Sequence, residues 1–251
     1  MSSSVPTLRL GCVPYLNAKP LIQGLSGVEL DVPARLAESL GAGRLDCALV
    51  PIVEYFHRPD YQIVPGVAIA SRGPVRSVYL AYRGALSQLR RVAPDPASRT
   101  SSLLMRVVLR VFYELKVEEA PDAEAKLLIG DPALLSRARF QAEGWNLLDL
   151  GEEWHEATGL PFVYAAWLLR AGAPAADCIR TLQDAKTRGM AAIDEIARAE
   201  NRFPEKMVRS YLGGAIRYDL GPEELRGLSE FQRLLAKHGW IRAEQELRMA
   251  A

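Results

Sequence analysis

Histidine, cysteine and blocks of like charge are all scarce in this chain of 251 residues. There are three histidines and three cysteines, and none falls into the spacing of a zinc site or of a catalytic triad. An odd number of cysteines, far apart and mostly in apolar surroundings, is typical of buried thiols in a reducing compartment. We therefore expect neither a metal centre nor a disulfide framework.

The chain also lacks a strong net charge, a long apolar run and a glycine-rich nucleotide loop. Its formal net charge of +1 gives no electrostatic argument for binding nucleic acid or a membrane surface. No apolar run has the length of a membrane span, and residues 1–15 show no basic region followed by an apolar one, so we expect a cytoplasmic protein. The patterns GxSxG, GxxxxGK(S/T) and GxGxxG after a strand are absent, which removes support for acyl transfer, nucleotide hydrolysis and dinucleotide chemistry.

What the sequence does show is an alternation of strand and helix patterns. Residues 8–60 alternate between short apolar strands and amphipathic helices, and extended segments broken by proline and glycine follow at 61–83. A second alternating series covers 91–160, and a strand pattern lies at 161–170. Everything after residue 173 is rich in helix formers.

Two such series joined by extended segments predict an α/β fold with two lobes and a ligand cleft between them. We expect lobe 1 to be discontinuous, with residues 1–84 and 172–251, and lobe 2 to comprise residues 85–171. Ligands of such folds meet the carboxyl ends of parallel strands and the helix starts that follow. The segments 14–20 and 93–102 occupy positions of this kind.

Residues 93–102, APDPASRTSS, lead into an apolar-periodic run and predict a helix start. Ser98 is placed to cap this helix, and Arg99, Thr100 and Ser101 lie in its first turn. Unpaired backbone N–H groups and the positive end of the helix dipole make such a start suitable for an anion. Serine-rich starts also cap helices that bind nothing, and the residues alone leave both interpretations open.

Other polar side chains stand near predicted strand ends. Asn17 follows the first strand, where its amide either orients a hydroxyl or carboxylate or caps a helix. Ser77 lies in the extended segment VRSVYLAY, where a hydroxyl is unexpected unless it faces a polar cleft or pairs locally. Ser71 precedes the Gly-Pro turn before it. Thr158 and Phe162 belong to an aromatic-rich stretch that lines either a cavity or the core.

No carboxylate has the pattern of a general base. Asp131, at the end of a strand and the start of a helix, has the pattern of an N-cap. Glu152 and Glu153 are adjacent, so they do not share a helix face and do not form a coupled pair. The residues alone predict a cleft for a small anion and leave open whether the cleft also catalyses.

Five stretches taken together resemble the MqnA family, the chorismate dehydratases of the futalosine pathway of menaquinone biosynthesis. The stretches, in the order of the family, are VPYLNAKPL, GVAIASRGPVRSVYL, APDPASRTSSLL, LLIGDPAL and LGEEWHEATGLPFVYAAW. The resemblance runs from about Leu8 to about Leu169 and is weaker in the helical tail. It implies a type II periplasmic-binding-protein-like fold.

The resemblance also implies a hydro-lyase without a cofactor, whose small-molecule substrate is chorismate and whose product is 3-(1-carboxyvinyloxy)benzoate. It gives catalytic roles to Asn17 and Ser77. The substrate-binding residues that we expect are Ser71, Ser98, Arg99, Thr100, Ser101, Thr158 and Phe162. An amide is a poor base, so Asn17 is expected to position the substrate, and the enolpyruvyl carboxylate of the substrate itself is expected to take the proton.

Two alternatives remain. MqnD-like enzymes, which make 1,4-dihydroxy-6-naphthoate on the same fold, open with an SPCPNDTF-like stretch, where this chain has VPYLNAKP. A non-catalytic protein that binds small carboxylates is the other alternative. A secreted receptor of that kind would need an export signal or a lipid-attachment cysteine, which residues 1–15 do not show. The sequence carries no signal for oligomeric state.

Overall fold

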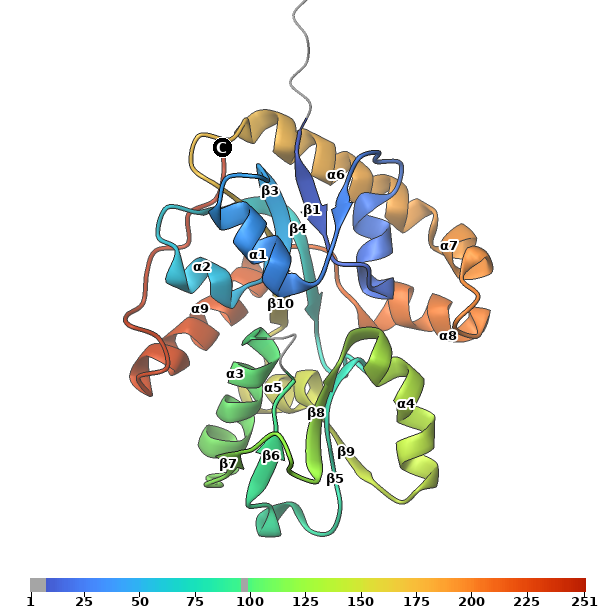
Figure 1. Cartoon of the computed structure of the whole chain (residues 1–251), viewed down its shortest axis with the longest axis vertical. Coiled ribbons are helices and arrows are strands. Elements are labelled where there is room, and N and C mark those ends of the chain that lie inside the picture. Colours follow the sequence, from blue (N-terminus) through green and yellow to red (C-terminus); the bar gives the residue numbers. More distant parts are fainter. Residues whose placement is uncertain (1–7, 96–98) are drawn as a thin grey trace, which may run out of the picture.

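The structure, a computed structural model, describes residues 8–95 and 99–251 and contains two five-stranded sheets, one above the other in Figure 1. The first sheet has the order β2-β1-β3-β10-β4, formed by Glu29–Leu30 (β2), Leu10–Cys12 (β1), Cys47–Pro51 (β3), Phe162–Leu169 (β10) and Gln62–Ser71 (β4). The second has the order β7-β6-β8-β5-β9, formed by Glu118–Glu119 (β7), Arg91–Ala93 (β6), Ala125–Ile129 (β8), Val78–Tyr82 (β5) and Asn146–Asp149 (β9). The predicted two-lobed α/β fold is confirmed.

Helices cover both sheets (Figure 1). Those grouped with the first sheet are the 3-10 helix η1 (Leu16–Ile22), α1 (Pro33–Gly41), α2 (Val53–His57), α6 (Ala175–Ala191), α7 (Ile193–Ala199), α8 (Glu205–Ser210), the π-helical turn η4 (Tyr211–Ala215) and α9 (Pro222–Lys237). Those grouped with the second are the 3-10 turn η2 (Leu86–Gln88), α3 (Arg99–Arg106), its π-helical continuation η3 (Val107–Phe112), α4 (Gly130–Ala142) and α5 (Leu150–Thr158).

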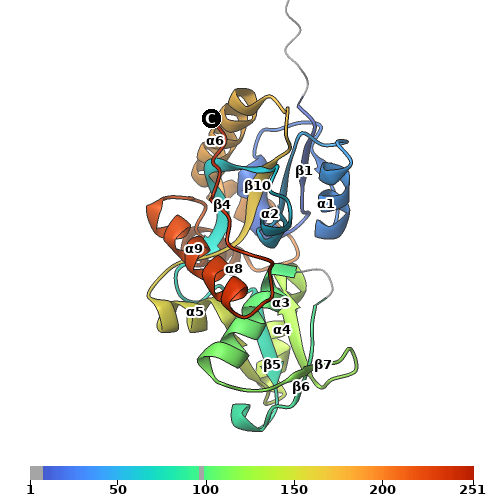
Figure 2. The same ribbon diagram turned by 90° about the vertical axis from the view of Figure 1, so that its left-hand side faces the viewer.

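The helical tail returns to the first sheet, as the sequence predicts. Helix α6 packs on β4 and η1, and α9 packs on β10. Figure 2 shows the segment after α9 running back along the first sheet, where Met249 forms a parallel bridge with Ile63 of β4. Strands β3 and β10 are apolar over most of their length because they lie in the middle of this sheet, covered on both faces.

The chain passes between the two sheets at residues 72–77 and again at residues 159–161. Strand β5 pairs with β8 and β9 in the second sheet, whereas β10 pairs with β3 and β4 in the first. From this pairing we propose lobe boundaries within these two crossings, one strand earlier than those expected after residues 84 and 171. Both strands concerned, β5 and β10, are extended and apolar, so only long-range pairing decides the sheet that each joins.

Asp46, just before β3, ties together strand ends of the first sheet. Its carboxylate accepts hydrogen bonds from the backbone N–H of Arg9 at 3.1 Å, from the Arg9 guanidinium at 2.6 Å and from the Arg170 guanidinium at 2.6 Å. Hydrogen bonding from Arg9, and to a smaller extent from Arg170, lowers the pKa of Asp46 to about 2. The ionised carboxylate therefore stabilises the folded protein at neutral pH.

Replacing Asp46 by asparagine is expected to lower the free energy of unfolding by about 1–2 kcal/mol at neutral pH. The pKa of this group is lower in the folded than in the unfolded protein, so its contribution is complete above about pH 4 and is lost as the pH falls through about 2. Urea unfolding of both proteins across this range measures the effect. A stability difference that stays constant down to about pH 2 would contradict the assignment.

Candidate active site

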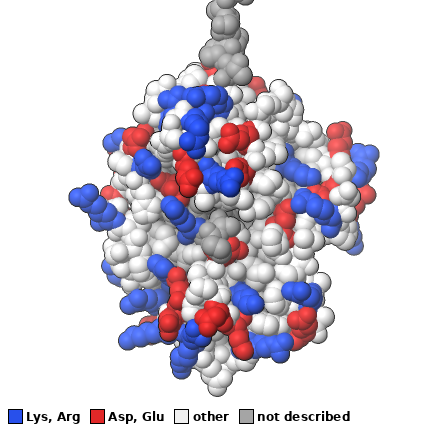
Figure 3. All heavy atoms as spheres, in the orientation of Figure 1, with Lys and Arg blue, Asp and Glu red and all other residues white. Residues whose placement is uncertain are grey.

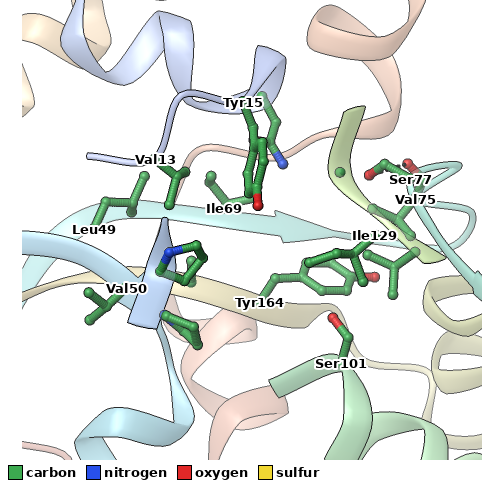
Figure 4. A pocket seen from close by; sticks show the side chains of 16 residues that line it. Val13, Tyr15, Leu49, Val50, Ile69, Val75, Ser77, Ser101, Ile129 and Tyr164 are labelled. Carbon is green, nitrogen blue, oxygen red and sulfur yellow. Dashed lines mark hydrogen bonds between the residues drawn. The ribbon is translucent and has the colours of Figure 1, made fainter. Parts of the chain in front are cut away.

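A pocket with about 580 Å³ of empty space lies where the two sheets meet, and Figure 4 shows it from close by. Its wall is mostly apolar, with side chains such as Leu49, Ile69 and Ile129. Elements of both lobes build it, among them β3, β4 and β10 of the first sheet and the starts of α3 and α4 over the second. A concave apolar pocket with a few polar groups is the usual form of a small-molecule site.

Three residues expected from the sequence line this pocket: Asn17 from η1, Ser77 immediately before β5, and Ser101 from the first turn of α3. They come from both lobes, and Figure 4 shows Ser77 and Ser101 on different sides of the cavity. Tyr15 and Tyr164 add their rings and hydroxyl groups to the lining. The structure thus brings together an amide and several hydroxyl groups in one small cavity.

The side-chain oxygen of Asn17 is the most informative polar atom of the pocket. Asn17 Oδ1 is buried and has no hydrogen-bond partner within residues 8–95 and 99–251. Almost all buried acceptors in native proteins are paired, so an unpaired one that lines a pocket is suited to accept a hydrogen bond from a ligand. A ligand hydroxyl is a donor that fits this atom, whereas a carboxylate is not.

Asp131 fixes the start of η1 against the other lobe. Its carboxylate accepts a hydrogen bond from the backbone N–H of Leu16 at 2.9 Å and one from the Arg202 guanidinium at 2.8 Å. Arg202 also binds Glu200 at 2.8 Å, and Glu200 accepts a hydrogen bond from Lys19 of η1 at 2.7 Å. This network joins α4 of the second lobe to η1 and therefore sets the position of Asn17.

The interpretation of Asp131 as the cap of its own helix is wrong. The N-cap of α4 is Ile129, and no side chain caps this helix start. Asp131 lies in the first turn instead, and its carboxylate serves the start of η1, which is 115 positions away in the sequence. A short acidic residue at a strand end does indicate a capping role. The helix that it caps lies in the other lobe, and no local sequence pattern indicates that.

Ser77 is held from two directions. Its Oγ accepts a hydrogen bond from the Tyr211 hydroxyl at 2.7 Å, and the crossing segment just before it is bound by Asp149. The carboxylate of Asp149 accepts hydrogen bonds from the backbone N–H groups of Val75 at 3.0 Å and Arg76 at 2.7 Å. Arg76 has a φ of 65°, a conformation that residues with a side chain rarely adopt and that concentrates at functional sites.

Ser71 lies behind the pocket wall. Its hydroxyl shares a hydrogen bond of 3.0 Å with the hydroxyl of Tyr164 and donates to the carbonyl of Gly73 at 3.1 Å. Burial raises the pKa of Tyr164 well above its usual value. Tyr164 lines the pocket, whereas Ser71 is not among the lining residues, so Ser71 orients this tyrosine and does not face the cavity.

The residues of the predicted helix start make different kinds of contact. Thr100 is buried, and its hydroxyl accepts a hydrogen bond from the backbone N–H of Val53 at 3.4 Å, a contact between the two lobes. Arg99 is exposed and pairs with Glu54 at 3.1 Å. Ser98 lies outside the described residues. Within the described part of this segment, Ser101 is the residue that reaches the pocket.

Thr158 and Phe162 have packing roles in the structure. The Thr158 hydroxyl donates to the carbonyl of Trp154 at 2.7 Å and accepts from the N–H of Leu160 at 3.1 Å, which closes the end of α5. Phe162 is buried, with its ring 5.2 Å from that of Trp154 and 4.8 Å from that of Phe231, measured between centroids. Neither Thr158 nor Phe162 is among the lining residues.

Two site residues that sequence reasoning missed differ in how they could have been found. Gly130 was visible in IGDPAL; it has a φ of 60°, and a Cβ there would lie 3.5 Å from the ring of Tyr15. That separation is an ordinary van der Waals contact, so it is the positive φ that favours glycine at the start of α4. Tyr211 lies 134 positions from Ser77, inside a tail with only helix signals, and nothing local in the sequence pointed to it.

The pocket holds no charged side chain among its described lining residues. Negative charge on a ligand would therefore be met by hydroxyl groups and by the starts of α3 and α4, both of which reach the lining. On the face shown in Figure 3, acidic and basic side chains are intermixed. Within residues 8–95 and 99–251, no cluster of three potential metal ligands is present and no helix has the length and apolarity of a membrane span.

Comparison with known proteins gives consistent matches. Residues 8–237 match a family described as menaquinone biosynthesis. A chorismate dehydratase of Thermus thermophilus is 30% identical, with 90% of this chain and 94% of that protein covered. A chorismate dehydratase of Campylobacter jejuni is 29% identical, with 60% of this chain and 58% of that protein covered.

The solved structures that are similar share the fold. A protein from Archaeoglobus fulgidus has a TM-score of 0.70 at 15% identity, with 93% of this chain and 98% of that chain covered. A Candida albicans protein described as having the generic periplasmic-binding-protein fold has a TM-score of 0.66 at 10% identity, covering 98% of both chains. The aliphatic sulphonate binding protein of Escherichia coli has a TM-score of 0.59 at 15% identity, with 99% and 95% covered. The predicted periplasmic-binding-protein-like fold is confirmed.

Proposed function

The chain belongs to the menaquinone-biosynthesis family, and on this basis we propose that it is a chorismate dehydratase. Such an enzyme is a hydro-lyase that removes water from chorismate and leaves 3-(1-carboxyvinyloxy)benzoate. The structural observation that supports this function best is the pocket between the lobes, where a buried amide oxygen without a partner and two serines from the other lobe meet in an apolar cavity.

The substrate supplies much of the driving force. The ring carbon that carries the enolpyruvyl ether loses its proton, which is acidic because the ring carboxylate is conjugated with that position. The electron pair of the C–H bond enters the ring, the C–O bond of the neighbouring hydroxyl breaks, and the ring becomes aromatic. The proton and the hydroxide leave together as water. The protein must orient the substrate and stabilise negative charge on the ring carboxylate.

The polar residues in and around the pocket have roles that fit this demand. Ser101 at the start of α3 and Ser77 just before β5 donate hydrogen bonds to a carboxylate, and the dipole of α3 adds to the effect of Ser101. Asn17 Oδ1 accepts the hydrogen bond of the departing hydroxyl, since that atom is a buried acceptor. Ser71 and Thr100 act indirectly, through Tyr164 and through the backbone of Val53. Thr158 and Phe162 are left out of the proposed site.

The proton acceptor is the enolpyruvyl carboxylate of the substrate itself. The described lining residues include no Asp, Glu, His or Lys, and the amide of Asn17 is too weak a base to remove a proton from carbon. A carboxylate within the same molecule acts at high effective concentration once its conformation is fixed. The protonated carboxylic acid then gives its proton to the departing hydroxide, which completes the water molecule.

In this proposal the protein acts in the cytoplasm. Its small-molecule substrate is chorismate. The three cysteines among the described residues are free and buried, which suits a reducing compartment. The fold is shared with a protein named as an aliphatic sulphonate binding protein, so conversion of the ligand is the property that would separate an enzyme from a binding protein.

Incubation of the purified protein with chorismate tests the proposal. Mass spectrometry and chromatography are expected to show a product that has lost one water and retains the enolpyruvyl ether at the meta position of a benzoate. Chorismate without protein and with the Asn17→Ala variant serve as controls for spontaneous decay. Binding of chorismate without turnover would instead indicate a carboxylate-binding protein, and a protein that neither binds nor converts chorismate would refute the assignment.

A further inference from the structure

A tyrosine from the C-terminal tail holds Ser77, one of the residues on which the proposed reaction depends. Tyr211 lies in the π-helical turn η4, is buried, and donates its hydroxyl proton to Ser77 Oγ at 2.7 Å. Burial raises the pKa of Tyr211, whereas its contacts with Ser77 and with the side chain of Asn17 lower it by hydrogen bonding. π-Helical turns within helices are frequent at functional sites, because they redirect a side chain that an α-helix would place elsewhere.

A phenol has one proton to donate, and Tyr211 donates it to Ser77 Oγ. With its oxygen already accepting, Ser77 has its own proton left for another acceptor.

Asn17 and Ser77 each keep one polar group for a ligand. Among the residues that the structure describes, Asn17 Oδ1 has no partner, and the Ser77 hydroxyl donates only to the carbonyl of Val75 at 3.5 Å, a distance at which a hydrogen bond between oxygen atoms is weak. Both residues line the pocket. The pocket therefore offers a ligand one acceptor, Asn17 Oδ1, and one donor, the Ser77 hydroxyl.

We propose that Tyr211 is a positioning residue that donates to Ser77 Oγ and so presents the Ser77 hydroxyl as a donor to the substrate, beside the acceptor Asn17 Oδ1. This inference rests on the proposed dehydration of chorismate. In that reaction the acceptor meets the departing hydroxyl and the donor meets the carboxylate on which charge develops.

The test is the Tyr211→Phe variant, which keeps the buried ring and removes the hydroxyl. We expect kcat for chorismate to fall roughly tenfold, the size of effect of one lost orienting hydrogen bond, with KM changed less than about threefold. In a Ser77→Ala background the same substitution is expected to cause no further loss of kcat, because Tyr211 acts through Ser77. A residue with a purely structural role would lower activity in both backgrounds alike.

Tyr218→Phe is the matched control. Tyr218 is also buried in the C-terminal tail, and its hydroxyl has no hydrogen-bond partner in the described part of the chain, so its removal should leave kcat unchanged. Thermal unfolding of each variant shows whether folding is retained. If the Tyr211→Phe protein unfolds below the assay temperature, the hydroxyl is needed for folding, and the proposal is overturned.

The outcomes separate the inference from the function on which it rests. Wild-type protein that does not convert chorismate overturns both. Wild-type conversion together with full activity of Tyr211→Phe overturns the positioning role and leaves the proposed function intact. If Tyr211→Phe lowers kcat by the same factor in the wild-type and in the Ser77→Ala background, the positioning role is overturned as well. A selective loss of kcat that disappears in the Ser77→Ala background supports it.

Discussion

Replacing Ser77 by alanine is expected to lower kcat for chorismate roughly 10²–10³-fold with little change in KM, the effect of removing one donor that stabilises charge in the transition state. Ser77 lines the pocket, its oxygen is held by Tyr211, and the backbone before it is fixed by Asp149. Such a rigid hydroxyl needs no reorganisation as charge develops. Steady-state kinetics with chorismate measure the effect.

Ser71→Ala is the matched control for this substitution. Ser71 is as buried as Ser77 but lies behind Tyr164 and not on the pocket wall, so the loss of its hydroxyl should reduce kcat less than tenfold. Equal losses from the two substitutions would contradict the distinction between a residue that touches the substrate and one that orients a neighbour.

Replacing Gly189 by alanine is expected to have the largest effect on stability, roughly 3 kcal/mol, and to lower kcat about 10²-fold. Gly189 lies in α6 where this helix meets η1, and a Cβ there would stand 1.8 Å from the carbonyl oxygen of Pro20. The contact is with backbone, so η1 itself must move. Asn17, three residues before Pro20 in η1, would move with it.

Chemical denaturation and kinetics of the Gly189→Ala protein test this prediction, with Gly214→Ala as the control. Gly214 has no atom within 4 Å of an added Cβ and no positive φ, so alanine there should be tolerated. A Gly189→Ala protein of normal stability and activity would show that η1 can shift freely, and that its fixed position has no part in the reaction.

Much of the fold could be predicted from local signals. Pro33 at the start of α1 and the apolar strands β3 and β10 follow directly from helix-start chemistry and burial. Strand β4 was harder, because Pro65 and Gly66 break its pattern; it nevertheless runs without interruption, with irregular register against β10. The π-helical end of the long helix, η3, has no propensity signature.

The site likewise has a part that local sequence signals predict and a part that they do not. Asn17, Ser77 and Ser101 were found because strand ends and helix starts are where two-lobed folds place their ligand contacts. The contacts that fix these residues join positions more than a hundred residues apart, as between Asp131 and Leu16 or between Tyr211 and Ser77. Only the packing of the two lobes decides them, and no periodicity or local motif reports on it.

The most direct test of the account is a crystal structure of the Ser77→Ala variant with chorismate bound. The account predicts chorismate between the lobes, with its ring hydroxyl within hydrogen-bond distance of Asn17 Oδ1, one carboxylate at the start of α3 near Ser101, and the enolpyruvyl carboxylate beside the proton to be removed. Chorismate bound outside this pocket, or a side-chain carboxylate or imidazole in contact with that proton, would contradict it.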